Sequence, residues 1–367
     1  MSHKVYGDNK VFCKGRLISG PDVRSCAFSA LMIVVPSVLW HVDATLMYER
    51  YTPIPILIGL MQLASLVLLL VTAFSDPGIM PRQRDYSEQY DDRTKAFRNK
   101  QPPRYYEVLM RGHPFKLKYC TTCNIYRPPR CTHCSVCENC IERFDHHCPW
   151  IGNCIGKRNY WLFYSFISCT GFMNFSVLVS SVAQILIVFM EFMDGEMGAG
   201  SALVKTLAQE PLIAAVIVYC LTIVWFTVGL CIYHNYLVCT NQTTYEQIKG
   251  AYRNVTNPFT RGVLANCADV LCSRVRPRYF NPATGQLLWP TATPSSGSAA
   301  AMLAEKVWGG DAMDASEPEK EHARGRRPSL EMLGRMARRT KGPSRAEGAA
   351  AAEPAEPSDE VAITEPS

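Results

Sequence analysis

The sequence predicts an all-α polytopic membrane protein, with four transmembrane helices and a cytosolic Cys-rich domain between helices 2 and 3. Three observations indicate this fold class. The hydrophobic residues, 48% of the chain, are collected in long uncharged blocks, whereas a soluble domain would disperse them. Eight of the sixteen cysteines and three of the eight histidines fall between Cys120 and Cys154. Lys and Arg are concentrated in three of the five segments outside the blocks.

The uncharged blocks define the four predicted spans. The first covers residues 25–42 and is short for a span, with Pro36 inside it, which membrane helices tolerate. The second covers residues 54–74, and the third runs from 159 to 190 with an aromatic start, YWLFYSF, that suits a membrane interface. The fourth lies at roughly 211–236. The alternative, a set of buried soluble helices, is improbable for four such runs together.

The basic residues predict the orientation of the spans. In chain order, the five non-membrane segments hold 5, 1, 15, 1 and 16 Lys plus Arg residues. Because cytosolic loops carry the excess of Lys and Arg, we expect both termini and the Cys-rich stretch in the cytosol. That compartment keeps thiols reduced, which favours zinc over disulfides. The net charge of +6 fits a membrane surface, and no motif predicts binding to nucleic acid.

These features divide the chain into six segments. We expect a cytosolic N-terminus (1–25), transmembrane helices 1 and 2 (26–74), a cytosolic segment (75–159) with its Cys-rich domain at about 117–159, transmembrane helices 3 and 4 (160–236), a cytosolic segment that returns to the membrane (237–280) and a disordered tail (281–367). The tail is rich in Pro, Ala, Ser, Gly and charge, so it cannot offset the entropy of ordering. It contains RGRRPSL, which resembles a phosphorylation site at Ser329.

The Cys-rich stretch has the spacing of zinc ligands. Closely spaced Cys pairs with interleaved His are what tetrahedral zinc requires, and a disulfide framework is the alternative. Two closed zinc sites would use eight of the eleven Cys and His donors, and spacing alone leaves open which three remain. The adjacent Asp145, His146, His147 and Cys148 can supply an orienting carboxylate, a base and a thiol nucleophile.

Several motifs together resemble the DHHC-type protein S-acyltransferases. They are Asp145–Trp150 (DHHCPW) with its continuation CPWIGNCIGKRNY, KLKYC at the first Cys pair, RPPR before His133, Asp76-Pro77-Gly78 after the second span and Thr243-Thr244-Tyr245-Glu246 after the fourth. The resemblance covers roughly residues 20–275. The motifs CPWIGNC and NQTT most resemble the branch of the family that acylates Ras-like substrates.

The resemblance implies a division of the donors. By position it assigns one zinc ion to Cys120, Cys123, His133 and Cys140, and a second to Cys134, Cys137, His147 and Cys154. Both ions would be structural, because each ligand set is closed. Cys131 is then a bystander, His146 a base and Cys148 the nucleophile, with Asp145 orienting the imidazole.

The resemblance also implies a reaction. Cys148 would accept a long-chain acyl group from palmitoyl-CoA and pass it to a cysteine of a membrane-apposed protein, small GTPases included, with a small accessory subunit as a further partner. The chemistry is reasonable, because a free thiol with a pKa near 8.5 needs a neighbouring base at neutral pH. Cys148 precedes Tyr160 by only twelve residues, so the thiol should lie near the bilayer. Burying about 15 methylenes there is worth on the order of 10 kcal/mol.

Several residues outside this set are candidates for supporting roles. Lys157 and Arg158 could bind the CoA phosphates, or they are ordinary cytosolic anchors. His234 in the fourth span is an intramembrane ionisable residue, and such residues are often functional, although one near a helix end can simply be solvated. We expect four further residues to give structural support, with Asn266 in the returning segment: Asp76, Thr244, Glu246 and Asn266.

Two other functions compete with acyl transfer. A membrane-tethered zinc-binding scaffold would use the Cys-rich domain only to recruit partners. A transporter or channel is weaker, because the spans carry almost no ionisable residues. We expect the protein in the endomembrane system, at the Golgi, the endoplasmic reticulum or the plasma membrane, and span length does not distinguish these membranes.

Overall fold

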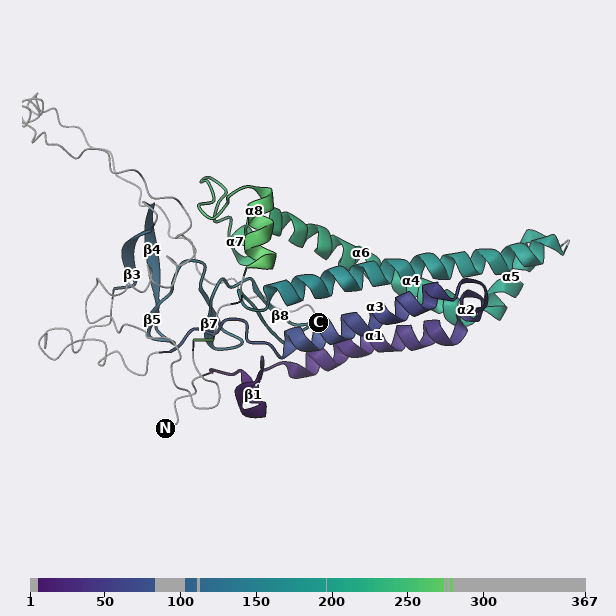
Figure 1. Ribbon diagram of the computed structural model, residues 1–367, viewed down its shortest axis with the longest axis horizontal. Coiled ribbons are helices and arrows are strands. Elements are labelled where there is room, and N and C mark those ends of the chain that lie inside the picture. The colour runs from purple at the N-terminus through teal and green to yellow at the C-terminus, as the bar shows by residue number, and fades with distance from the viewer. Residues whose placement is uncertain are drawn as a thin grey trace, which may run out of the picture. The chain divides into compact units, whose positions relative to one another are not determined.

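A computed structural model describes residues 6–82, 103–110, 113–195, 197–273, 275 and 278–279. Its four long apolar helices confirm the predicted spans: α1 (Val23–Asp43), α3 (Pro53–Ala73), α4 (Tyr160–Asp194) and α6 (Pro211–Thr240). They run side by side, with α4 against both α3 and α6, and α1 against α3 and α6 (Figure 1). The predicted disordered tail and Ser329 lie outside the described residues.

The four helices have the surface of membrane helices. Large apolar side chains on their outer faces are exposed, among them Phe28, Leu57, Phe172 and Trp225. In water such helices would leave an extensive apolar surface uncovered, whereas the lipid of a bilayer covers it. The chain is therefore a multi-pass membrane protein.

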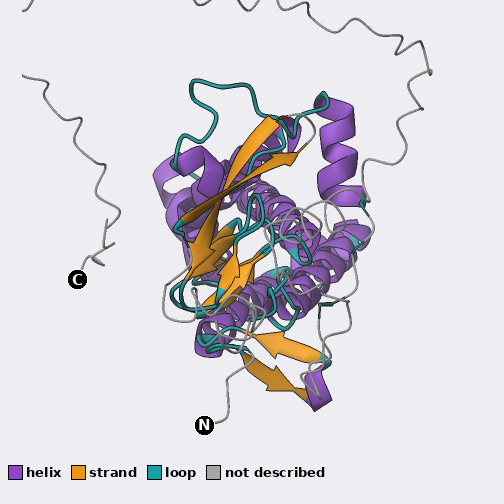
Figure 2. Ribbon diagram, turned by 90° about the vertical axis from the view of Figure 1, so that its left-hand side faces the viewer, coloured by secondary structure: helices purple, strands orange, loops and turns teal. Residues whose placement is uncertain are grey.

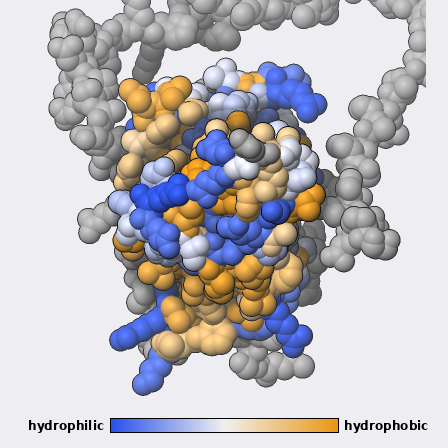
Figure 3. All heavy atoms as spheres, turned by 90° about the vertical axis from the view of Figure 1, so that its right-hand side faces the viewer, coloured by the Kyte–Doolittle hydropathy of each residue, from blue (hydrophilic) through white to orange (hydrophobic). Residues whose placement is uncertain are grey.

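The end of the bundle farthest from the Cys-rich segment differs from the sequence prediction. Two short helices, α2 (Thr45–Tyr51) and α5 (Ala199–Gln209), form where loops were expected. Polar side chains gather at the centre of this face, with hydrophobic ones around them (Figure 3). Gln184 Nε2 donates to the Asp43 backbone oxygen at 2.8 Å and to Glu210 Oε2 at 2.6 Å, which ties the ends of α1, α4 and α6 together.

The opposite end carries the strands, all in antiparallel pairs. An N-terminal hairpin is followed by a three-stranded sheet and two short hairpins: β1 (Lys10–Phe12) and β2 (Leu17–Ser19) around the 3-10 turn η1 (Cys13–Gly15), then β3 (Tyr105–Met110), β4 (His113–Cys120) and β5 (Ile125–Tyr126), then β6 (Thr132–Cys134) with β7 (Asn139–Ile141), and β8 (His146–Cys148) with β9 (Asn153–Ile155). These strands lie over one end of the helices (Figure 2). After α6 come α7 (Thr244–Ile248), α8 (Val263–Cys267) and the π-helical turn η4 (Ala268–Cys272).

Polar contacts fix the Cys-rich segment to the bundle. Asp76 Oδ1, just after α3, accepts from the backbone nitrogens of Gly78 at 2.8 Å and Ile79 at 3.1 Å. Asn153 Nδ2 donates to the backbone oxygens of Ala73 at 3.1 Å and Ser75 at 3.0 Å. The β8–β9 hairpin is therefore anchored directly to the end of a membrane helix.

Candidate active site

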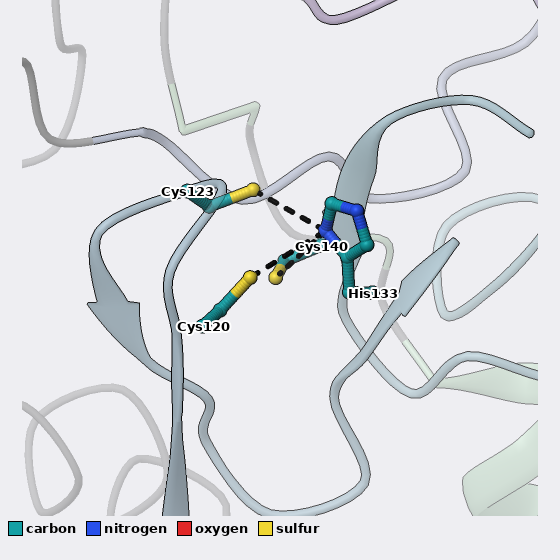
Figure 4. A group of neighbouring side chains, drawn as sticks. All are labelled: Cys120, Cys123, His133 and Cys140. Carbon is teal, nitrogen blue, oxygen red and sulfur yellow. Dashed lines mark hydrogen bonds between the residues drawn. The ribbon is translucent and has the colours of Figure 1, made fainter. Parts of the chain in front are cut away.

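Two groups of Cys and His side chains converge in the Cys-rich segment. Within each group all four donor atoms lie within 4.8 Å of one another, and the groups are Cys120, Cys123, His133 and Cys140, and Cys134, Cys137, His147 and Cys154. In the first group, the His133 Nδ1 atom lies 3.5 Å from the Cys120 and Cys123 sulfurs (Figure 4). In the second group, the His147 Nδ1 atom lies 3.4 Å from the Cys137 sulfur and 3.6 Å from the Cys154 sulfur.

These distances fit tetrahedral zinc. With Zn–S bonds of about 2.3 Å and Zn–N bonds of about 2.0–2.1 Å, tetrahedral angles place the sulfur and nitrogen ligands about 3.5 Å apart. Three sulfurs and one imidazole nitrogen around one centre are a zinc donor set. Each group is complete with four protein ligands, so a zinc ion there would cross-link the chain and would have no open position for water.

The Cys-rich segment repeats itself every 14 residues. Three tight turns each begin with a cysteine paired across a hairpin to the residue five positions on: Cys120 with Ile125, Cys134 with Asn139 and Cys148 with Asn153. Each turn has one residue at positive φ in the same place: Asn124 at 54°, Glu138 at 52° and Gly152 at 70°. The second thiol of the turn is Cys123 in the first and Cys137 in the second, but the third has Ile151, which is 1% exposed. The signal of the repeat in the sequence is the spacing of Cys120, Cys134 and Cys148, each 14 residues from the next.

Strand geometry separates the two adjacent histidines. His146, His147 and Cys148 form β8, and successive side chains of a strand point to opposite faces. His147 points toward the second cysteine group, so His146 and Cys148 share the other face. The Cys148 thiol is buried and within hydrogen-bonding reach of the His146 ring. A base and a thiol therefore meet away from the metal ligands.

Asp145 orients the His146 ring from a buried position. His146 Nδ1 and Asp145 Oδ2 are 2.7 Å apart, and Asp145 is 1% exposed. Thr244 holds the carboxylate through its backbone nitrogen, 2.9 Å from Oδ1, and its hydroxyl, 2.7 Å from Oδ2. The arrangement places Asp145, His146 and Cys148 in the order of a carboxylate–imidazole–thiol relay.

Burial and hydrogen bonding act in opposite directions on this pair. Burial lowers the pKa of His146, but its hydrogen bonds to Asp145 and Cys148 outweigh burial and raise the pKa to about 10. Burial likewise raises the pKa of Asp145, but the hydrogen bond and the charge of His146, together with the Thr244 backbone hydrogen bond, outweigh burial, so the pKa of the carboxyl lies below its ordinary value. Asp145 is thus a carboxylate that supports a proton on His146.

A buried ion pair holds Thr244 in place. The Glu246 carboxylate accepts hydrogen bonds from Arg130 Nε at 2.7 Å and from Arg130 Nη2 at 2.7 Å. The Glu246 side chain is only 9% exposed, and that of Arg130 only 5%. Glu246 also caps α7. Its carboxylate accepts a hydrogen bond from the Thr243 backbone nitrogen, and the Thr243 hydroxyl accepts one from the Glu246 backbone nitrogen. The link from Arg130 was missed in the sequence, since the partners are 116 residues apart.

A cavity runs from Cys148 into the helix bundle. Its lining is almost entirely apolar and comes from α1, α3, α4 and α6, with Cys148 and Trp150 at one end and Asn174, Val177 and Tyr219 among the deeper residues. The lining residues of α4 extend from Phe163 to Val177, which at about 1.5 Å per residue is a depth of about 21 Å. A narrow apolar cavity of this depth suits a long-chain acyl group.

The other predicted residues have defined partners. Lys157 Nζ lies 3.2 Å from Glu142 Oε1, and Arg158 Nε lies 3.3 Å from Asp76 Oδ2, so both cations are paired and mostly buried. Asn266, 1% exposed, donates to the Cys239 backbone oxygen at 2.8 Å, which fastens α8 to the end of α6.

Two predicted residues lie close to the site. His234 is 1% exposed, so of the two interpretations left open by the sequence, that of a residue solvated at a helix end does not hold. The approach of α4 to α6 covers the His234 ring. Cys131 is buried beside the first cysteine group, and its thiol contacts Cys140.

Comparison with known proteins gives a consistent result. A family model described as DHHC palmitoyltransferase matches residues 113–251. Protein S-acyltransferase 8 of Arabidopsis thaliana is 38% identical over 77% of this chain and 72% of its own length. Probable protein S-acyltransferase 2 of the same plant is 36% identical over 75% of this chain and 68% of its own length. Human palmitoyltransferase ZDHHC18 is 37% identical over 74% of this chain and 71% of its own length.

Proposed function

Because the chain belongs to the DHHC palmitoyltransferase family, we propose that Cys148 is the nucleophile of its two-step protein S-acyl transfer. The protein is a membrane-bound protein S-acyltransferase. The observation that carries the assignment of Cys148 is its position, since this thiol both contacts His146 and lines the apolar cavity between the helices.

The first step loads the enzyme. The Cys148 thiol gives its proton to His146, and the sulfur attacks the thioester carbonyl of a fatty acyl-CoA. The C–S bond to CoA breaks, the CoA thiolate recovers the proton from the imidazolium, and the acyl group remains on Cys148. Asp145 holds the ring and balances its charge in between. The acyl tail rests in the cavity, so it is never transferred through water.

The second step empties the enzyme. A cysteine thiol of a substrate protein gives its proton to His146 and attacks the acyl-Cys148 thioester, which releases the Cys148 thiolate to be reprotonated. The two zinc ions, held by the two groups of four ligands, would fix the loops on which these residues stand. The substrates would be membrane-apposed proteins with cytosolic cysteines, small GTPases among them, because only such thiols can reach a site at the membrane surface.

The CoA end of the donor needs positive charge near Cys148. We assign this role to Lys157 and Arg158, directly after β9, where phosphate groups would compete with Glu142 and Asp76 for the two cations. The Lys and Arg distribution supports a cytosolic active site and cytosolic termini, with the protein in the Golgi, the endoplasmic reticulum or the plasma membrane. An accessory subunit would act in the same compartment.

Labelling of the purified full chain with alkyne-palmitoyl-CoA tests the proposal. Wild type should acquire a hydroxylamine-labile label, Cys148→Ser should not, and Cys131→Ser should label like wild type because that thiol is outside the relay. Cys148→Ser should keep its zinc. A labelled Cys148→Ser variant would move the nucleophile elsewhere. An unlabelled wild type, with zinc bound and the accessory subunit co-expressed, would favour the non-catalytic scaffold.

A further inference from the structure

His234 is a buried imidazole that the relay of Asp145, His146 and Cys148 does not use. It lies in α6, six residues before the end of the helix at Thr240, and is 1% exposed. Its Nδ1 atom and the Tyr160 hydroxyl, at the first residue of α4, are 3.0 Å apart. This hydrogen bond joins the two helices at the level of the active site.

The His234 ring forms part of the wall behind His146. The centroids of the two imidazoles are 6.2 Å apart. Phe163 lies against both rings edge-on, with its centroid 4.9 Å from that of His234 and 5.2 Å from that of His146. His146 therefore packs against one side chain of α4, Phe163, and lies close to one of α6, His234.

Such a wall has a purpose for the reaction. The hydrogen bond that His146 Nδ1 donates to Asp145 fixes one nitrogen of the ring, but a single bond leaves the ring free to rotate about that contact. The other nitrogen must stay within reach of Cys148, and a misplacement of about 1 Å can cost roughly 100-fold in rate. Packing against Phe163 and His234 removes this freedom.

A purely apolar wall would be simpler to build inside a membrane. An imidazole buried without a partner is destabilising, and leucine at position 234 would avoid that cost. The chain instead has a histidine with a tyrosine hydroxyl as its hydrogen-bond partner, and intramembrane ionisable residues of this kind are usually functional. A simple link between the helices does not explain the histidine, because a second hydrogen bond already joins α4 and α6. The Tyr164 hydroxyl, one helical turn after Tyr160, lies 2.8 Å from Asn235 Oδ1, next to His234.

We propose that His234, held by Tyr160, is a positioning residue that keeps the His146 imidazole aligned with Cys148. The inference rests on the proposed acyl-transfer function and adds the fourth span to the active site. Neither residue touches the zinc ligand sets among the described residues, so the inference makes no demand on metal binding.

Single-turnover acylation of Cys148 in the full-length zinc-loaded protein tests this role. His234→Leu and Tyr160→Phe should each lower the maximal rate about 10- to 100-fold without changing the acyl-CoA concentration that gives half the rate. The double variant should be no slower than the slower single variant, because each substitution removes the same hydrogen bond between Tyr160 and His234. His234→Asn should recover much of the rate, since an amide can occupy the Nδ1 position and bond to Tyr160.

The neighbouring hydrogen bond between Tyr164 and Asn235 supplies matched controls. Tyr164→Phe and Asn235→Leu remove an equivalent α4–α6 hydrogen bond that does not reach His146, and both should stay within about twofold of wild type. Zinc content should be unchanged in every variant. Wild-type rates in His234→Leu, or equal losses in the Tyr164 controls, would overturn the inference while leaving the acyltransferase intact. A wild-type protein that is never acylated would instead refute the function.

Discussion

Replacing Glu246 should open α7 locally, because the residue is the buried half of an ion pair. Glu246→Leu removes four acceptor contacts: from Arg130 Nε at 2.7 Å, from Arg130 Nη2 at 2.7 Å, from the Thr243 nitrogen at 2.9 Å and from the Tyr252 hydroxyl at 3.2 Å. It also leaves Arg130, 5% exposed, as a buried charge without its carboxylate. Breaking one side of a buried pair typically costs about 3–5 kcal/mol.

That cost can be measured as hydrogen exchange. At about 1.4 kcal/mol per factor of ten, a loss of about 3–5 kcal/mol should speed exchange of the α7 amides by roughly two to four orders of magnitude. Mass spectrometry of the peptide that contains Thr244 reports this directly, with a peptide from the middle of α4 as the internal control. Opening α7 also withdraws both Thr244 hydrogen bonds from Asp145, so acylation of Cys148 should slow in parallel.

The double variant decides whether the pair is the cause. Arg130→Leu alone should also speed exchange, because Glu246 then lacks its cation. In Arg130→Leu with Glu246→Leu no unpaired charge remains, so the combined effect should be smaller than the sum of the single effects by at least 1–2 kcal/mol. Additive single effects, or exchange in Glu246→Leu within about threefold of wild type, would refute the assignment.

Three further perturbations test separate parts of the site. His147→Ala should lower zinc from two ions per chain to about one, measured by mass spectrometry, whereas His146→Ala should keep both and lose roughly 100- to 10,000-fold in acylation rate; equal zinc loss would contradict the division. Ile151→Cys should complete the third tight turn, so cadmium should give a thiolate absorbance band and block Cys148, while Ile151→Ser should not respond; equal responses would count against the repeat. Asn174→Phe should fill the deep part of the cavity and shift donor preference from palmitoyl-CoA to shorter acyl-CoAs in competition assays, and an unchanged preference would place the acyl tail elsewhere.

Local signals in the sequence were enough for the membrane helices. A span is recognised by the absence of charge over about 20 residues, which needs no knowledge of what packs against it. The helices α4 and α6 extend beyond the predicted 190 and 236, to Asp194 and Thr240, because helical hydrogen bonding continues past the apolar block. The short helices at the far end were missed, since their loops have no comparable signal.

Contacts between distant segments could not be predicted in the same way. Whether His234 faces solvent, lipid or the active site depends on the rotation of α6, which hydropathy does not report. The pairing of Lys157 with Glu142 depends on how the chain turns between β7 and β9, which the sequence does not report. Lys157, predicted to bind a CoA phosphate, therefore already has a carboxylate partner in the structure. The division of the zinc donors came from family resemblance, and the geometry brings together the same two sets.

The 14-residue repeat gives a topological reason why Cys148 belongs to neither group of metal ligands. Each group of four ligands combines the two thiols of one tight turn with a His–Cys pair that lies directly across the next hairpin: His133 with Cys140, and His147 with Cys154. Cys148 begins the third turn, whose ligand set would need residues 151, 161 and 168. These are Ile151, Trp161 and Ser168, and the last two lie in α4, where the chain enters the membrane.

The third turn thus keeps the shape of a zinc turn without the means to bind zinc. Gly152 preserves the positive φ of the turn, and the hairpin register is the same as in the second. A zinc ion held by His147 and Cys154 would fix the hairpin on either side of Cys148, whose sulfur belongs to neither ligand set among the described residues. A thiol held as rigidly as a metal ligand, but left without metal beside His146, has the position and the freedom that a nucleophile needs.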